Sequence, residues 1–123
     1  MNHHFFLSIV HLLLIAPFLF FVGFQRAATP SWVFNALFIV GGIILFYHGI
    51  KLFVLLSQNV SYAWVNALHV LLVAPLLILI GYHNKNTPRY MYELLLILTF
   101  GLVGYHMMNI IRLLETNTEL AME

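Results

Sequence analysis

The chain has 123 residues, of which 63% are hydrophobic and only 7% are charged. A soluble globular domain carries about 25% charged residues, so this composition excludes an ordinary water-soluble fold. The formal net charge of +1 is too small for binding along a nucleic-acid backbone, and the lack of cysteine excludes disulfides and thiolate chemistry.

Four apolar runs follow one another along the chain, and each has roughly the 20 residues that a membrane-spanning helix needs. They cover residues 5–24, 32–56, 62–82 and 90–114, and a short polar tail follows at 115–123. Aromatic residues collect near the ends of these runs, as they do at membrane–water interfaces. The sequence therefore predicts an all-α membrane protein, with one transmembrane domain that is a four-helix bundle in the lipid bilayer.

Two short connections join the first helix to the second and the third to the fourth. Residues 23–30 read GFQRAATP and residues 81–88 read GYHNKNTP, so glycine stands where one helix ends and Thr-Pro where the next begins. Threonine is a good N-cap, proline suits the first helical turn, and such short connections favour antiparallel neighbours. Five glycines inside the helices are expected to permit close helix packing: Gly41, Gly42, Gly49, Gly101 and Gly104.

The chain aligns with itself without a gap when it is shifted by 58 residues (69 − 11). The shift brings His11 onto His69 and matches the Ala-Pro, Gly, Thr-Pro and Tyr-His positions, and about a third of the residue pairs are identical. Apolar composition alone would not align these residue types in one register. We infer that a two-helix hairpin was duplicated, with repeat 1 at about 5–56 and repeat 2 at about 62–114. Repeats of two spans are parallel and related by a pseudo-twofold axis along the membrane normal.

The positions of lysine and arginine predict the orientation, because cytoplasmic loops carry an excess of these residues. The side of the two connections has three cations, and the side of the termini has two together with the acidic tail. We therefore expect the connections in the cytoplasm and both termini outside. The residues concerned are Arg26, Lys85 and Arg89 on the first side, and Lys51, Arg112, Glu115, Glu119 and Glu123 on the second.

Four of the seven histidines lie inside the predicted spans. A polar side chain is costly in a bilayer, so it usually faces the bundle interior and marks a functional site. His11 and His69 follow the starts of their helices by about as many residues as His48 and His106 precede the ends of theirs. At about 1.5 Å per residue, all four are expected in one layer roughly 10 Å below the interface on the side of the termini.

Other polar residues accompany the histidines at helical spacing. An i,i+3 separation puts Ser8 and Asn66 on the faces of His11 and His69. The remaining supporting residues of the predicted layer are Tyr47, Lys51, Tyr105 and Asn109.

Two further pairs of residues belong to the prediction. Pro17 and Pro75 are expected to kink the first and third helices and to free backbone carbonyls there. Asn35 and Glu93 lie about 220° around the helix from His48 and His106, so we expect them on another face and at the other side of the membrane.

Three functions fit such a layer. Neutral imidazoles bind metals, so His11, His48, His69 and His106 would bind a haem b iron or a transition-metal ion. The layer would alternatively conduct protons, with Glu93 at the far side. It would otherwise join helices by hydrogen bonds in a structural scaffold. Catalysis has no positive support, because motifs for nucleotide binding or nucleophilic catalysis are missing from the sequence, and the wide apolar faces are compatible with a homo-oligomer.

Three segments of the sequence are similar to those of a known group of proteins. They are WVNALHVLLVAP at 64–75, GYHNKNTP at 81–88 and LVGYH at 102–106. They resemble small duplicated membrane proteins encoded by large DNA viruses of algae and other protists, over most of the chain. The resemblance implies a virion or host membrane as the location, and it implies no activity and no functional residues.

Overall fold

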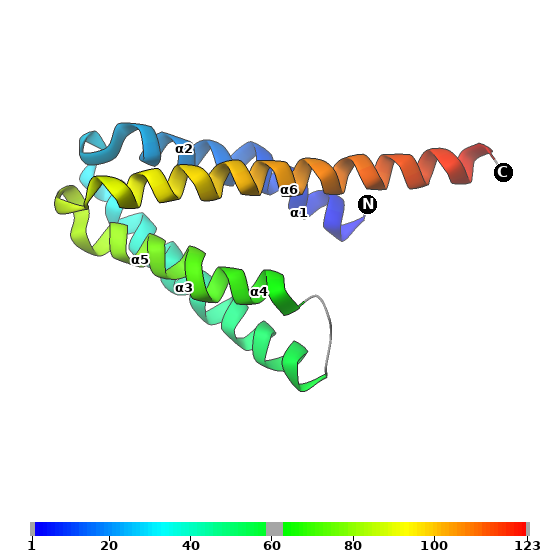
Figure 1. Ribbon diagram of the computed structural model, residues 1–123, viewed down its shortest axis with the longest axis horizontal. Helices are drawn as coiled ribbons and strands as arrows, with labels where there is room; N and C mark the ends of the chain where they lie inside the picture. Colours follow the sequence, from blue (N-terminus) through cyan, green and yellow to red (C-terminus); the bar gives the residue numbers. More distant parts are fainter. Residues whose placement is uncertain (1, 59–62, 123) are drawn as a thin grey trace. The chain divides into compact units, whose positions relative to one another are not determined.

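The computed structural model describes residues 2–58 and 63–122, and its elements in this part are helices joined by short turns (Figure 1). Within the described residues, four continuous helical stretches are long and apolar enough to cross a membrane. They are His3–Ala28, Ser31–Ser57, Trp64–Asn86 and Arg89–Met122. The four predicted helices are therefore confirmed as apolar helices, although the expected start of the third, Tyr62, lies outside the described residues.

The first and third stretches are each interrupted by one π-helical turn. The first consists of α1 (His3–Val10), the π turn η1 (His11–Ile15) and α2 (Ala16–Gln25). The third consists of α4 (Trp64–Leu68), the π turn η4 (His69–Val73) and α5 (Ala74–His83). The second stretch is the single helix α3 (Ser31–Ser57), and the fourth is α6 (Arg89–Met122), which continues through the expected polar tail.

Proline accounts for both π turns. Pro17 and Pro75 have no N–H, and a proline ring collides with the carbonyl four residues earlier in a regular α-helix. Widening the preceding turn moves that carbonyl aside. The Ala16 N–H accordingly bonds to the oxygen of His11, five residues back, and the Ala74 N–H bonds to that of His69. Each π turn thus begins at an in-span histidine.

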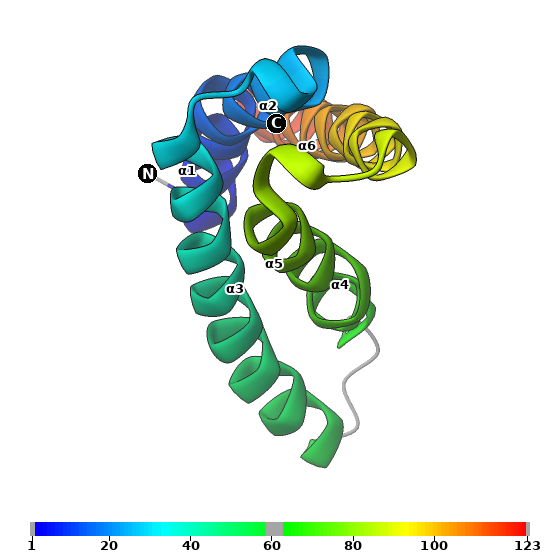
Figure 2. The same cartoon turned by 90° about the vertical axis from the view of Figure 1, so that its left-hand side faces the viewer.

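The chain divides into two compact units. Unit 1 combines Met1–Phe24 with Glu93–Glu123, and unit 2 is Gln25–Tyr92. In unit 1, α1 and α2 lie alongside α6, and the rings of Phe20 and Phe100 meet edge to face at 4.9 Å (Figure 1). In unit 2, α3 packs against α4, η4 and α5 (Figure 2). Each unit therefore contains one long helix from each half of the chain.

Two glycines allow α3 and α5 to approach closely in unit 2. A β-carbon on Gly81 would lie 2.6 Å from the Phe38 nitrogen and 2.7 Å from the Phe34 oxygen. A β-carbon on Gly41 would lie 2.8 Å from the Cγ1 atom of Ile78. The expected packing role is confirmed for Gly41. It is wrong for the other four glycines of that prediction, which have open space around them: Gly42, Gly49, Gly101 and Gly104.

The two connections share a backbone conformation that the sequence did not indicate. Arg26 and Asn84 have positive φ angles of 51° and 53°, and each begins a short 3-10 turn, η2 (Arg26–Ala28) or η5 (Asn84–Asn86). These two residues, rather than the glycines before them, have the positive φ angles at the points where the chain reverses. The two turns pack against each other in unit 2.

The threonines of the connections are not N-caps, so that prediction is wrong. The Thr87 hydroxyl donates to the Ile80 oxygen at 3.1 Å and to the Asn84 oxygen at 2.6 Å, which satisfies carbonyls at the end of the preceding helix. The buried Thr29 hydroxyl has no hydrogen-bond partner among the described residues. Helix α3 instead begins after Pro30, without a side-chain cap.

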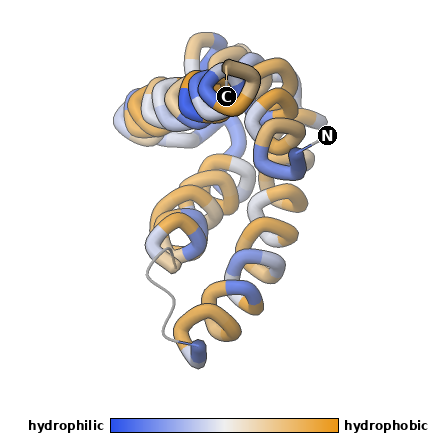
Figure 3. The backbone as a smooth tube through the Cα atoms, turned by 90° about the vertical axis from the view of Figure 1, so that its right-hand side faces the viewer, coloured by the Kyte–Doolittle hydropathy of each residue, from blue (hydrophilic) through white to orange (hydrophobic). Residues whose placement is uncertain are grey.

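Large apolar side chains cover much of the outer surface of each unit. Leu13 in unit 1 and Phe53 and Leu71 in unit 2 have exposed fractions of 72%, 76% and 76%. Figure 3 shows that hydrophobic residues predominate along α3. Exposed apolar surface on this scale is unfavourable in water and fits contact with lipid chains.

Candidate functional site

Unit 2 contains a stacked pair of histidines, one from α3 and one from the start of η4. The rings of His48 and His69 have centroids 4.2 Å apart and planes inclined by 14°. Nδ1 of His48 hydrogen-bonds to the Oδ1 atom of Asn66 at 2.8 Å, and Nδ1 of His69 to the Val65 oxygen at 2.7 Å. The bond between His48 and Asn66 links two helices, whereas that of His69 stays within its own helix.

Unit 1 contains a pair with the same construction, from η1 and α6. The rings of His11 and His106 have centroids 4.4 Å apart and planes inclined by 19°. Nδ1 of His11 hydrogen-bonds to the Leu7 oxygen at 2.7 Å, and Nδ1 of His106 lies 3.1 Å from the Ser8 hydroxyl. Every member of this pair lies 58 residues from its counterpart in unit 2.

The hydrogen bonds decide which ring nitrogen carries the proton. A carbonyl oxygen only accepts, so Nδ1 of His11 and of His69 must be the N–H donor. The amide oxygen of Asn66 imposes the same tautomer on His48. In the neutral form of these three rings, Nε2 therefore carries the lone pair. The Ser8 hydroxyl can donate or accept, so His106 is compatible with either tautomer.

The histidine pairs share the hydrogen-bond pattern of metal-binding histidines but not the orientation of the rings toward a common metal. A histidine that binds a metal usually donates its second ring N–H to a carbonyl or carboxylate, which orients the ring, and three of these rings do so. However, each pair presents ring faces to one another, and a metal binds in the ring plane at a nitrogen. Within the described residues, groups of three or more His, Cys, Asp or Glu that could hold a metal ion were not found.

The structure thus brings the four predicted site histidines together as two pairs. His11 stacks on His106, and His48 stacks on His69. Each pair lies inside one unit, and each draws one histidine from either half of the chain. A single layer that contains all four remains a prediction from the sequence.

The supporting residues of the predicted layer fall into two groups. Ser8 and Asn66 are buried, with exposed fractions of 1% and 6%, and contact the histidine of the facing helix. The other group is exposed or half-buried. Tyr47 and Tyr105 meet their neighbouring histidines edge to face, Lys51 has its ammonium 5.9 Å from the Tyr47 ring, and Asn109 is half-buried.

The remaining predicted residues lie on other faces of their helices. Asn35 and Glu93 are exposed, in contrast to the half-buried histidines of the same helices. Sequence reasoning missed the carbonyls of Leu7 and Val65 as partners of the histidines. The available signal was the distance of four residues along the helix, at which a side chain can reach a carbonyl of the preceding turn.

Comparisons of the chain with protein-family models, with curated proteins and with solved structures found no match. The function is therefore inferred from the residues of this chain and their geometry alone.

Proposed function

We propose that the chain is a multi-pass integral membrane protein with four spanning helices, built by duplication of a helical hairpin. The length and apolar character of the four helices support the membrane location. The duplication is supported by local structure at positions 58 residues apart, where the π turns, the positive φ angles and the stacked histidines recur. The connections lie in the cytoplasm and the termini outside, in keeping with the lysine and arginine positions.

The function that the geometry supports best is structural: each histidine pair joins two membrane helices. The observation that carries this proposal is the stack of two imidazoles with a hydrogen bond to the facing helix, found twice with the same construction. Polar contacts between membrane helices contribute about 0.6–2 kcal/mol each. Two such contacts in matched positions stabilise both units and fix which helix faces pack together.

Binding of a haem iron or a transition-metal ion is the second candidate. The observation that favours it is the tautomer of His11, His48 and His69, whose Nδ1 atoms are engaged so that Nε2 is the ligand nitrogen. Coordination requires the rings of a pair to turn out of their stack, because a metal lies in the plane of each ligand ring. Cofactor binding would therefore replace the stack with a different arrangement of the same side chains.

One preparation separates the two candidates. The protein is purified in detergent from cells supplied with haem precursor and metals, its visible spectrum is recorded, and bound metals are measured. The structural function predicts a colourless, metal-free protein that is fully folded. It also predicts that His11→Ala and His69→Ala lower the melting temperature, whereas His83→Ala, in a helix-end histidine outside both pairs, does not. A Soret band or bound metal that disappears in His11→Ala and His69→Ala but stays in His83→Ala would establish coordination instead.

A further inference from the structure

Charge is distributed very unevenly between the two units. Residues 25–92, which form unit 2, contain four lysine or arginine residues and neither aspartate nor glutamate. Glu93 follows unit 2 directly in α6 (Arg89–Met122), four residues after Arg89, and the other three acidic residues lie at 115–123. Two of its cations, Arg26 and Lys85, lie in the turns η2 and η5 at the connection end of unit 2. This end of unit 2 therefore suits an anionic ligand.

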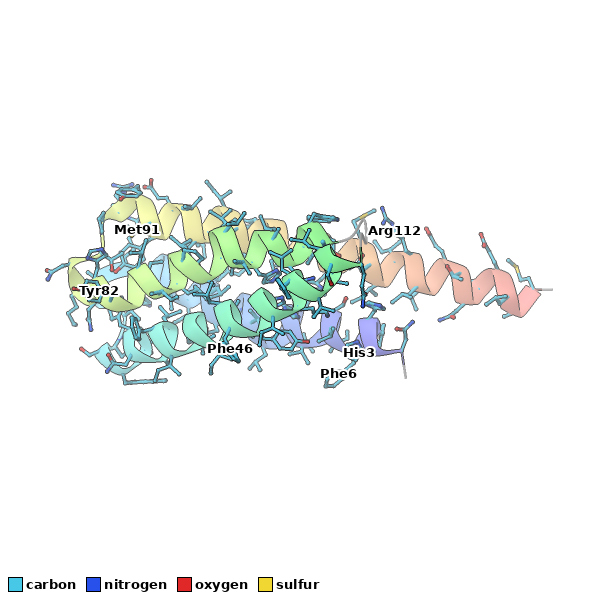
Figure 4. All side chains as sticks on the ribbon, turned by 90° about the horizontal axis from the view of Figure 1, so that it is seen from below. His3, Phe6, Phe46, Tyr82, Met91 and Arg112 are labelled. Carbon is cyan, nitrogen blue, oxygen red and sulfur yellow. The ribbon has the colours of Figure 1, made fainter. Side chains whose placement is uncertain are left out.

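A shallow hollow lies at the same end of unit 2, between the start of α3 and the end of α5. Gly81 is one of its lining residues, and the absence of a side chain there lets α5 approach the α3 backbone closely. Figure 4 shows Tyr82 at this end of the unit, with Phe46 further along α3. The hollow has both apolar and polar lining residues, and they are Asn35, Phe38, Ile39, Gly81, Tyr82 and Asn84.

Two cations belong to the turns next to the hollow. Asn84 lines the hollow, and its Oδ1 atom accepts a hydrogen bond from the backbone N–H of Lys85 at 2.9 Å. Arg26 begins the turn η2, which packs against the turn η5 that contains Lys85. Positively charged turns thus lie next to a hollow with apolar lining residues. Both are at the end of helices that are long enough to reach a membrane interface.

We propose that this hollow binds an anionic phospholipid. The phosphate lies against Arg26 and Lys85, and an acyl chain follows the exposed side chains of Phe38 and Ile39 along α3. A ligand with a negative head and a long apolar tail satisfies both halves of the surface, whereas a free phosphate would use only the cations. Basic sites between membrane helices on the cytoplasmic side recognise anionic head groups in this way.

The experiment uses the full chain in detergent, with phosphatidylglycerol or phosphatidylcholine added. Native mass spectrometry measures the retained lipid, and the melting temperature is recorded for each mixture. The wild type is expected to retain phosphatidylglycerol preferentially. In the double variant Arg26→Gln, Lys85→Gln, the ratio of retained phosphatidylglycerol to retained phosphatidylcholine is expected to fall about tenfold. Lys51→Gln removes one charge at the opposite end of α3 and should keep the preference.

Three results would overturn the proposal. Equal retention of the two lipids by the wild type would show that the head-group charge is not recognised. An equal loss of preference in Lys51→Gln and in single Lys85→Gln would show a response to net charge alone. Stabilisation by inorganic phosphate as large as that by phosphatidylglycerol would show that the acyl chain does not bind. Melting temperatures without lipid confirm that the variants are folded.

Discussion

Ser8 and Asn66 occupy corresponding places in the two units and perform the same task with different chemistry. Each lies three residues before the histidine of its own helix, yet each contacts the histidine of the facing helix. Both are almost fully buried, so an unmet hydrogen bond at either position would be costly. A hydroxyl and an amide oxygen both satisfy an imidazole Nδ1, which explains how two residue types suit one position.

At the scale of single residues, the serine in unit 1 suggests a conservative substitution for Asn66 in unit 2. Asn66→Ala removes the acceptor of the His48 hydrogen bond and is expected to lower the free energy of unfolding by about 1 kcal/mol. Asn66→Ser, which reproduces the residue found in unit 1, should retain most of the stability. Unfolding by SDS in mixed micelles measures both changes.

Asn35→Ala serves as the control for that comparison, because Asn35 is exposed near the start of the neighbouring helix. A loss in Asn66→Ser as large as that in Asn66→Ala would mean that the hydrogen bond is not the source of the effect.

Sequence reasoning identified the histidines and their polar neighbours but not their pairing. Helical spacing shows which residues share one face, so Asn66 was associated with His69. Spacing does not show which helix covers that face, and Asn66 in fact bonds to His48. The stacking of the rings depends on the same tertiary contact, so helical spacing could not predict it either.

At the scale of helices, glycine and proline act differently from what their positions first suggested. Gly81 does not reverse the chain, because that role falls to Asn84 with its φ of 53°. It permits contact between α5 and the α3 backbone instead. Pro75 was expected to kink its helix, but sequence alone could not specify a π turn that starts at His69. The contact of Gly81 depends on the backbone of a neighbouring helix, which the local residue pattern does not reveal.

The packing of α3 against α5 gives a second stability prediction. Gly81→Ala would bring a β-carbon within 2.6 Å of the Phe38 nitrogen, so one helix must move. We expect a loss of about 1–3 kcal/mol in the free energy of unfolding, as for other overpacked contacts. Differential scanning fluorimetry in detergent, supported by SDS unfolding, measures it.

Gly49→Ala is the matched control. Gly49 lies in α3, the helix against which Gly81 packs, and a β-carbon on Gly49 would meet nothing within 4 Å. This variant should be as stable as the wild type or slightly more stable, because alanine favours the helix. Equal stability of the two variants would contradict the close approach of α3 and α5.

At the scale of the whole molecule, hydropathy predicted the helices well and their ends less well. The polar tail is helical, and α6 reaches Met122. Glutamate, leucine, alanine and methionine in this tail are good helix formers, a property that hydropathy does not measure. The 34 residues of α6 span about 51 Å, against about 30 Å of membrane hydrocarbon, so a bilayer crossed by α6 would leave several of its turns outside the hydrocarbon.

The proposed orientation is testable because the chain contains no cysteine. Single-cysteine variants Lys85→Cys and Thr116→Cys are expressed in intact cells and treated with a membrane-impermeant maleimide. We expect Thr116→Cys to react from outside and Lys85→Cys to react only after the membrane is opened. The reverse pattern would show that the connections lie outside, and labelling of both in intact cells would contradict an odd number of crossings between them.

The composition of the two units has a consequence for the order of biosynthesis. Unit 2 is a continuous segment, so its helices can associate as soon as Tyr92 has been synthesised. The stack in unit 1 pairs His11 with His106, which lies 95 residues (106 − 11) later in the chain, and such distant contacts form late. The first helix therefore lacks its partner in unit 1 until about 80 further residues have been synthesised, and in a membrane it would be exposed to lipid for that time. A chaperone or the insertion machinery would have its longest contact with that segment.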